Sequence, residues 1–417
     1  MDNREHLYGK LNAIQVPASN VEQREYDVIV AGAGPAGSAA ASWLARSGAS
    51  VLMLDGAPFP RDKVCGDLLV EDSMQCLRAL DVAEEILEAG LETPRFRMLS
   101  PSRIPFDVPG RFVTLKREVL DAILAKTAHA RGAIFALGRV SSIEETDTGV
   151  KCRTDGGATF RAAAAVLATG ARVGLMKDRG MATQYGASAV AARCYIRAEK
   201  GPDYLLASYD RSIIPGYAWV FPMGGGEYNV GCGVFYNGKG NGTGKTNNVN
   251  LRTMFDTFMR QIREAREIRE TAVETGPLAG AVLRCGLGGF RMSPAARILP
   301  VGESAGATLP FTGEGIGKSM ETGRIAAEMI SAALASGDFS PLAGYPRVLE
   351  ERLRHRYTGY SMAQKWLAHA WVVDFLAARA RKNRFLRDSA IGIFKETVDP
   401  GAVFSVSGML RAVNPFG

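Results

Sequence analysis

The segment that most constrains the fold begins at Tyr26, where a short apolar run leads into closely spaced glycines. Residues 26–32 read Tyr-Asp-Val-Ile-Val-Ala-Gly and predict a buried strand. Residues 35–46 are rich in Ala and Ser and predict a helix, and residues 49–55 predict a second strand that ends at Asp55. A strand–helix–strand unit of this kind builds a parallel sheet with helices packed on its faces, so we expect an α/β fold.

The turn between the first strand and the helix has the spacing Gly-x-Gly-x-x-Gly at Gly32, Gly34 and Gly37, with Ala36 inside it. These glycines permit a tight turn, close approach of a pyrophosphate and close helix–strand contact. Phosphates would bind the exposed N–H groups at the start of the helix. Asp55 would accept hydrogen bonds from ribose hydroxyls. The combination predicts a dinucleotide site, because a glycine-rich turn that binds no ligand does not explain three glycines and an acid in register.

A second, distant element indicates FAD rather than NAD. Residues 297–306 predict a strand that ends in a glycine and an acid, and residues 310–317 open another helix. An extended FAD needs such a site for its ribityl chain, and a helix N-terminus can stabilise the anionic reduced ring. The residues expected to contact the cofactor here are Gly302, Glu303, Gly313, Gly315 and Ile316.

Two further stretches complete a family resemblance. Residues 61–67 read Arg-Asp-Lys-Val-Cys-Gly-Asp, and residues 116–121 read Lys-Arg-Glu-Val-Leu-Asp. Over roughly residues 26–335 the chain resembles the geranylgeranyl reductase family, within the glutathione-reductase-type flavoproteins that include the aromatic hydroxylases. The second stretch departs from the family's Arg-x-x-Phe-Asp element in lacking the aromatic pair, and Glu303 replaces the family's Asp. The resemblance implies additional cofactor contacts from Arg61, Cys65, Gly66 and Arg117.

A third motif points to the substrate. Tyr217, Trp219 and Phe221 alternate before a proline, and Gly231 and Gly233 follow after a gap of eight residues. This is similar to the family's Tyr-x-Trp-x-Phe-Pro…Gly-x-Gly signature, which lines an isoprenoid tunnel in that family. Alternation places the three rings on one strand face, where they form either a substrate wall or ordinary sheet core. Flavin halogenases carry Trp-x-Trp-x-Ile-Pro instead, so the outer residues disfavour halogenation. The substrate-facing set is Tyr217, Trp219, Phe221, Gly231, Gly233 and Pro310.

These motifs leave two reactions open. In the first, reduced FAD supplies a hydride to an isolated C=C bond of a prenyl chain and an acid supplies the proton. Cys65 is then either an apolar neighbour of the flavin or a proton-donating thiol, and the rings of Tyr217 and Trp219 stabilise cationic character, which makes all three candidate catalytic residues. The alternative is a flavin monooxygenase or epoxidase that tailors a prenylated or polycyclic aromatic natural product. A third class is a flavoprotein kept as a binding or electron-transfer module.

The electron source is equally open. No second Gly-x-Gly-x-x-Gly motif follows a clear strand, so no dedicated nicotinamide-binding domain is predicted. Electrons would come from NAD(P)H that docks transiently, or from a separate reductase or ferredoxin.

The expected architecture combines these elements. A glutathione-reductase-type FAD-binding Rossmann domain is interlocked with an antiparallel-sheet substrate domain and followed by a helical C-terminal region. The expected divisions are a loose polar extension at 1–25, a discontinuous FAD-binding domain at 26–92, 114–172 and 285–340, a substrate domain at 93–113 and 173–284, and the helical region at 341–417.

Composition excludes several other classes. The six cysteines form no CxxC pair and the four histidines lie outside every motif, so neither a metal site nor a disulfide scaffold is predicted. The first 25 residues are polar rather than signal-like, and no uncharged apolar run approaches the ~20 residues of a membrane span. A cytoplasmic protein is expected. No nucleic-acid-binding module is recognised, so a nucleic-acid partner is not expected.

The net charge of +7 is concentrated at the end of the chain, where residues 346–417 carry 12 Lys/Arg against 6 Asp/Glu. An apolar stripe at helical spacing precedes a basic cluster. Together they predict either a helix that contacts the inner face of a membrane or a lid that packs on the flavin domain with solvated arginines. The stripe is Met362, Trp366, Ala370, Val373 and Ala377, and the cluster is Arg379, Arg381, Lys382, Arg384 and Arg387.

Overall fold

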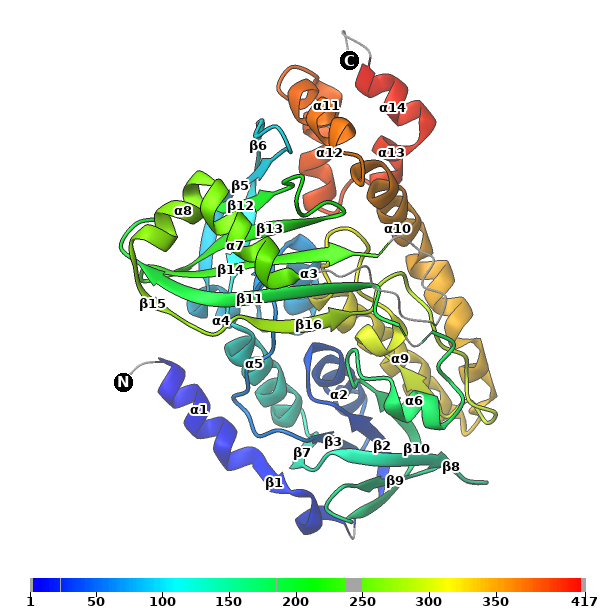
Figure 1. Ribbon diagram of the computed structural model, residues 1–417. Coiled ribbons are helices and arrows are strands. Elements are labelled where there is room, and N and C mark those ends of the chain that lie inside the picture. The colour runs from blue at the N-terminus through cyan, green and yellow to red at the C-terminus, as the bar shows by residue number, and fades with distance from the viewer. Residues whose placement is uncertain (1–2, 23, 185, 237–249, 414–417) are drawn as a thin grey trace.

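The computed structural model describes residues 3–22, 24–184, 186–236 and 250–413. Two sheets lie one above the other, and a long C-terminal helix runs along the side of both (Figure 1). The α/β class with an antiparallel sheet and a helical C-terminal region is confirmed.

The first sheet is built around the predicted strand–helix–strand unit. Its strands pair mostly in parallel, and the central one is buried on both faces, which explains its uninterrupted apolar sequence. Helices α2 (Pro35–Arg46), α5 (Arg117–Ala130) and α9 (Ile316–Ser336) pack against one another beside it. In sheet order the strands are β1 (Gln15–Pro17), β7 (Ile134–Leu137), β3 (Val51–Asp55), β2 (Tyr26–Ala31), β10 (Thr159–Leu167), β9 (Val150–Thr154) and β8 (Val140–Glu145), with β17 (Ile298–Pro300) also paired to β10.

The second sheet is mostly antiparallel and has nine strands. Helices α7 (Leu251–Gln261) and α8 (Arg263–Glu270) cover one of its faces, and α3 (Glu71–Ala79), α4 (Ala83–Ala89) and α6 (Gly174–Asp178) lie nearer the first sheet. In sheet order the strands are β15 (Ala272–Thr275), β11 (Ala189–Ala198), β14 (Glu227–Phe235), β13 (Gly216–Gly224), β12 (Leu205–Ser208), β5 (Leu91–Leu99), β6 (Pro105–Thr114) and β4 (Leu68–Leu69), with β16 (Ala279–Leu283) paired to β11.

Segments 93–113 and 173–284 therefore supply most of the second sheet. The exact division into domains stays a prediction.

The N-terminal segment differs from the loose extension expected from its polar composition. It forms helix α1 (Asn3–Ile14) and then β1, which pairs with β7. Leu7 and Leu11 lie one turn apart and are buried, and α1 packs against α5. These two leucines, with Tyr8 and Ile14 packed beside them, dock a helix whose composition is otherwise mostly polar.

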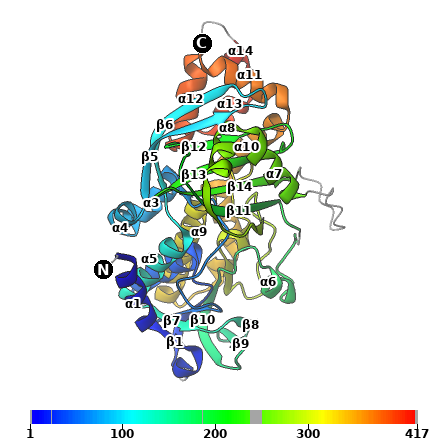
Figure 2. The ribbon, with the colours of Figure 1, turned by 60° about the vertical axis from the view of Figure 1, so that its left-hand side comes forward.

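The C-terminal region consists of α10 (Tyr345–Leu367), α11 (Ala370–Ala380), α12 (Arg384–Phe394), α13 (Pro400–Phe404) and α14 (Val406–Val413). Buried tyrosines hold α10 in place, because Tyr345 donates to the Pro300 carbonyl (2.9 Å) and Tyr357 donates to the Ala307 carbonyl (2.5 Å). Helices α11–α14 gather at the β6 end of the second sheet (Figure 2). Within the described ranges, no helix is long and apolar enough to cross a membrane.

Candidate active site

A cavity of about 1440 Å³ lies where the first sheet, the second sheet and the C-terminal helices meet. Pockets for one drug-sized ligand measure about 300–1,000 Å³. This cavity therefore has room for a cofactor and a second molecule.

The β2–α2 turn forms one end of the cavity, and its glycines have different tasks. Gly32 has a φ of +111°, and a Cβ there would lie 2.3 Å from the Ala168 carbonyl oxygen. A Cβ at Gly37 would lie 1.8 Å from the Gly32 carbonyl oxygen, so this glycine keeps the helix close to the strand. A Cβ at Gly34 would meet only the Arg61 guanidinium, at 3.6 Å, and Gly34 lines the cavity. The turn thus has the open backbone face that a pyrophosphate requires.

Asp55 stands at the end of β3 beside this turn. Its carboxylate accepts hydrogen bonds from the backbone N–H groups of Ala33 (2.9 Å) and Ala57 (3.1 Å). Arg61 lies 3.4 Å from Asp55 and 3.5 Å from Asp121. The acid and the arginine both line the cavity, where they fit the ribose and phosphate end of a dinucleotide.

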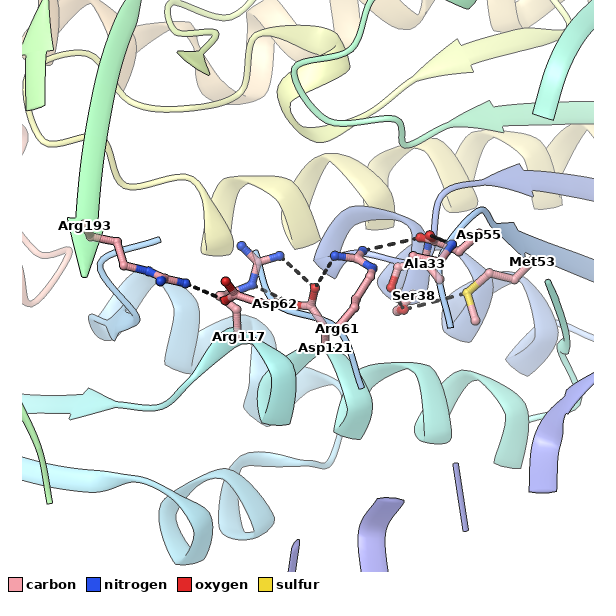
Figure 3. Close-up of polar contacts among 10 residues, drawn as sticks. Ala33, Ser38, Met53, Asp55, Arg61, Asp62, Arg117, Asp121 and Arg193 are labelled. Atoms are coloured by element: carbon pink, nitrogen blue, oxygen red, sulfur yellow. Dashed lines mark hydrogen bonds and ion pairs between the residues drawn. The ribbon is translucent and has the colours of Figure 1, made fainter. Parts of the chain in front are cut away.

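Figure 3 shows that Arg117, Asp121, Arg61 and Asp55 form one row of alternating charges. Asp121 is fully buried and binds the Arg117 guanidinium through both oxygens, at 2.8 and 2.9 Å. The sequence motifs predicted the other three residues as cofactor contacts but did not predict Asp121. The signal was its position four residues after Arg117 on the predicted helix, where the two side chains share a face.

The turn at Cys65 and Gly66 brings the cofactor end against the aromatic strand. A Cβ at Gly66 would lie 3.4 Å from the Phe221 ring and 3.8 Å from the Trp219 ring. Burial raises the pKa of the Cys65 thiol, and the nearby Asp67 charge raises it further, so the thiol stays neutral. The structure thus joins the predicted cofactor loop to the predicted substrate wall.

A buried hydrogen-bond network holds the turn at Cys65 and Gly66 against the aromatic strand. The sequence motifs did not predict this network. Asn229 donates to the Cys65 carbonyl and to the Asp67 carboxylate, both at 2.9 Å, and accepts from the Trp219 indole at 2.9 Å. The Tyr195 hydroxyl also donates to Asp67. Burial raises the pKa of Asp67 to about 6 against the opposing effect of these donors. Asn229 pairs with Phe221 across β13 and β14, so its place opposite the aromatic motif was the available signal.

The second acid element contributes Glu303 from the 3₁₀ turn Gly302–Ala305. Glu303 lines the cavity and accepts from the Arg284 backbone N–H at 3.3 Å. Burial raises the pKa of Glu303, while the positive charges of Lys63, Arg117 and Arg284 lower it. Cavity residues from the following loop are Gly313, Gly315 and Ile316, which lead into α9.

The aromatic motif is both cavity wall and sheet core. The rings of Tyr217 and Trp219 are 5.9 Å apart, those of Trp219 and Phe221 are 6.2 Å apart, and all three residues line the cavity. Gly233 lines it too. A Cβ at Gly231 would lie 2.3 Å from the Trp219 ring, so that glycine makes room for the indole rather than for a ligand.

Four of the predicted site residues lie just outside the cavity lining: Gly37, Gly231, Gly302 and Pro310. Gly302 supports the site indirectly, because a Cβ there would lie 2.9 Å from the Ala36 Cβ, and Ala36 does line the cavity.

The C-terminal helices close the far end of the cavity with apolar side chains. Part of the predicted stripe packs inward, because Val373 and Ala377 face the cavity and the Trp366 indole donates to the Phe404 carbonyl at 3.1 Å. Helical spacing predicted the stripe, but only the packed structure shows what covers it. We call this end of the cavity the apolar lobe; its lining from α11 to α13 is Val373, Leu376, Ala377, Ala380, Leu386, Ala390, Ile393, Phe394, Pro400, Val403 and Phe404.

Comparisons with known proteins agree with this geometry. A family model described as an FAD binding domain matches residues 25–197. The chain is 32% identical over 360 residues to a menaquinone reductase of Mycolicibacterium smegmatis, covering 81% of this chain and 83% of that one. It is 28% identical over 391 residues to digeranylgeranylglycerophospholipid reductase 1 of Methanopyrus kandleri, covering 88% and 98%.

Two solved structures share the fold. One is a geranylgeranyl bacteriochlorophyll reductase-like protein of Thermoplasma acidophilum, with a TM-score of 0.72, 23% identity and coverage of 94% of this chain and 96% of that one. The other is the flavin-dependent brominase Bmp2, with a TM-score of 0.74, 19% identity and coverage of 92% and 98%. At these identities both comparisons speak for the fold alone.

Proposed function

The chain belongs to the geranylgeranyl reductase family of FAD-dependent oxidoreductases, and we propose that it reduces isolated C=C bonds in the prenyl chain of a hydrophobic substrate. The observation that carries the proposal is the continuity of one cavity from the glycine turn, past the aromatic wall, to the apolar lobe. The two curated relatives described above are named as reductases of menaquinone and of a digeranylgeranyl lipid.

Different residues along the cavity would bind the cofactor and position the substrate. The turn at Gly32 and Gly34, with Asp55, would hold the ADP half of the cofactor, and Glu303 and the loop before α9 would hold its other half. When bound, FAD supplies hydride transfer. Trp219, fixed by its hydrogen bond to Asn229, would orient the alkene and exclude water.

The apolar lobe supports a long aliphatic occupant. Its lining from α11, α12 and α13 consists of aliphatic and aromatic side chains, and the charged cavity residue of this region is Glu396, in the turn between α12 and α13. Burying such a chain is worth about 0.8 kcal/mol per CH₂ group, so a prenyl tail would bind there more strongly than a compact ring.

We propose that electrons reach the cofactor from NAD(P)H that docks transiently or from a separate reductase or ferredoxin. Steady-state turnover with each donor alone distinguishes the two routes, and turnover with neither contradicts both.

We also propose that the outer face of the C-terminal helices contacts an anionic membrane surface from which the substrate is drawn. Trp371 on α11 and Leu410 on α14 are 65% and 68% exposed, and Val406 and Val413 beside Leu410 are also exposed. Arg381, Lys382, Arg384 and Arg387 are exposed on the adjoining turns. The inner faces of α11 and α12 line the apolar lobe, so a lipid would have a short path into the cavity.

Vesicle flotation tests this contact. The protein should float with anionic vesicles at low salt and detach as salt rises, because charge attraction is screened over about 8 Å at 0.15 M. Trp371→Ser combined with Leu410→Ser should abolish flotation, whereas Val273→Ser, which removes an exposed valine from β15, should not. A wild-type protein that never floats would contradict the proposal.

Product analysis under two atmospheres tests the reaction itself. Reduced enzyme given a prenylated quinone or prenyl lipid without oxygen should yield a product that has gained two hydrogens per bond reduced. Product that forms only in air and gains an oxygen atom would instead support the monooxygenase alternative.

A further inference from the structure

Two carboxyl groups from distant parts of the sequence meet beneath the first turn of α9. Asp72 is the second residue of α3, and Glu314 lies in the loop that leads into α9. Asp72 is only 5% exposed, and a Cβ at Gly317 would lie 2.2 Å from one of its oxygens. Both residues border the cavity.

Each carboxyl group has one oxygen that is well supplied with donors. Glu314 Oε1 accepts from the Ser73 hydroxyl at 3.0 Å and from the Gly317 N–H at 2.8 Å. Asp72 Oδ1 lies 2.7 Å from the Lys318 ammonium. These contacts account for half of the oxygen atoms in the pair.

The other two oxygens are buried and have no donor among the residues that the structure describes. They are Glu314 Oε2 and Asp72 Oδ2. Both carboxyl groups adjoin Gly317: Glu314 accepts from its N–H at 2.8 Å, and an Asp72 oxygen lies 2.2 Å from where its Cβ would be. Two buried carboxylates in contact repel strongly, whereas a single proton between them would satisfy both oxygens.

The surroundings favour retention of that proton. Burial raises the pKa of Glu314 well above its usual value, and the Asp72 charge raises it further, against the opposing effects of the Gly317 N–H and Lys318. Burial and Asp72 likewise raise the pKa of Glu396 to about 7. The other titratable or charged groups that face the pair are Cys76 on α3, Lys318 and Glu321 on α9, Arg356, Tyr357 and Tyr360 on α10, and Tyr217 on β13.

The pair is also joined to the proposed cofactor contacts. Glu314 stands between Gly313 and Gly315, which line the cavity, and its carboxylate holds the N–H of Gly317 in the first turn of α9. A change of charge on the pair would therefore act on the loop and helix start that adjoin the cofactor.

We propose that Asp72 and Glu314 share one proton at neutral pH, and that the charge of this pair sets the reduction potential of the FAD held in the cavity. With one proton, the pair carries one negative charge beside Lys318, which also pairs with Glu321. Loss of that proton leaves a second, uncompensated negative charge, which opposes addition of electrons to the flavin. The reduction potential then falls as the proton is lost with rising pH.

Glu314→Gln is the informative variant because it keeps the size of the side chain. Its carbonyl oxygen can still accept from Ser73 and Gly317, and its N–H can donate to Asp72 Oδ2. Glu71→Gln is the matched control, since Glu71 precedes Asp72 on α3, pairs with Arg78 and lies outside the cavity lining.

The test combines two measurements on the FAD-loaded protein, and neither needs a substrate. Infrared spectra at neutral pH should show the carbonyl stretch of protonated carboxyl groups in the wild type and Glu71→Gln, and this band should be weaker in Glu314→Gln, where the remainder belongs to other groups such as Glu396. In mildly alkaline solution, the potentials of the wild type and Glu314→Gln should differ by about 30 mV or more, a tenfold change in equilibrium constant for a two-electron couple. The two potentials should converge at neutral pH.

The results separate this proposal from the proposed reaction. An infrared band of undiminished intensity in Glu314→Gln, or potentials that stay equal in the wild type and Glu314→Gln at every pH, would overturn the proton-sharing pair. Neither outcome depends on whether a prenyl substrate is reduced.

Discussion

The two ends of the cavity are lined by different kinds of chemical group. The end at the β2–α2 turn is made of backbone groups and paired charges, and two of its glycines, Gly32 and Gly37, leave no room for a Cβ atom. The apolar lobe is made of side chains from three helices, several of them partly exposed to the cavity. A side chain that blocks a binding site made of backbone groups should abolish binding. A substitution in a lining made of side chains should change the shape of the pocket by degrees. The comparison predicts all-or-none effects at one end and graded effects at the other.

The largest effect is expected at Gly34. Valine is compatible with the extended backbone there, but its branches would fill the space that the turn leaves open. Gly34→Val should fold and lose FAD, as measured by the flavin released on denaturation of the purified protein. Gly344→Val, at another open glycine away from the cavity, should keep its FAD. Full retention of FAD by Gly34→Val would show that the turn is not the pyrophosphate site.

Trp219 lies between the two ends and should affect substrate more than cofactor. Truncation of a buried tryptophan to alanine costs about 3–5 kcal/mol of stability, so unfolding must be measured alongside activity. Trp219→Ala should lose turnover of a long prenyl substrate while keeping FAD. Trp219→Phe keeps an aromatic ring but loses the pyrrole half of the indole and its hydrogen bond to Asn229, so its turnover should lie between those of the wild type and Trp219→Ala. If a folded Trp219→Ala variant kept full activity, the indole would be part of the sheet core and not of the substrate site.

Asp67 belongs to the hydrogen-bond network between the two ends of the cavity, and the pH dependence of protein stability tests its role there. Its pKa rises from 3.8 to about 6 on folding, so the folded state binds the proton more tightly. Stability from this group is present below pH 3.8 and is lost as pH rises through about 6, amounting to roughly 3 kcal/mol. Asp67→Asn should flatten the decline in unfolding free energy over that interval in denaturant titrations. A decline of unchanged size would show that Asp67 titrates normally.

The smallest effect is expected in the apolar lobe. Ala377→Phe would shorten the space available to a substrate tail, so activity should shift towards shorter prenyl chains while FAD and stability change little. Ala378→Phe is the control, because Ala378 is the exposed neighbour on the same helix and does not line the cavity. Equal chain-length profiles for both variants would mean that the tail lies elsewhere.

The same contrast explains what the sequence could predict. The turn at Gly32 and the acid at Asp55 were predictable because their tasks follow from local backbone geometry. The apolar stripe of the C-terminal helices was predictable as a stripe, but Val373 and Ala377 face the cavity only because of how α11 packs, which helical spacing does not encode.

Residues that meet through tertiary packing could not be found in this way. Asn229 joins Cys65 to Trp219, and Asp72 meets Glu314, across long stretches of intervening sequence. Asp121 is the exception, since its spacing from Arg117 was visible on one helix.

The central claim is that one cavity brings FAD and a prenyl chain together for reduction. A single-turnover experiment tests it directly: the enzyme-bound FAD is reduced, excess reductant is removed, and a prenylated substrate is added without oxygen. We predict that the flavin reoxidises as the substrate is consumed, with one double bond reduced for each FAD. A flavin that stays reduced until air is admitted, with the substrate unchanged before then, would contradict the account.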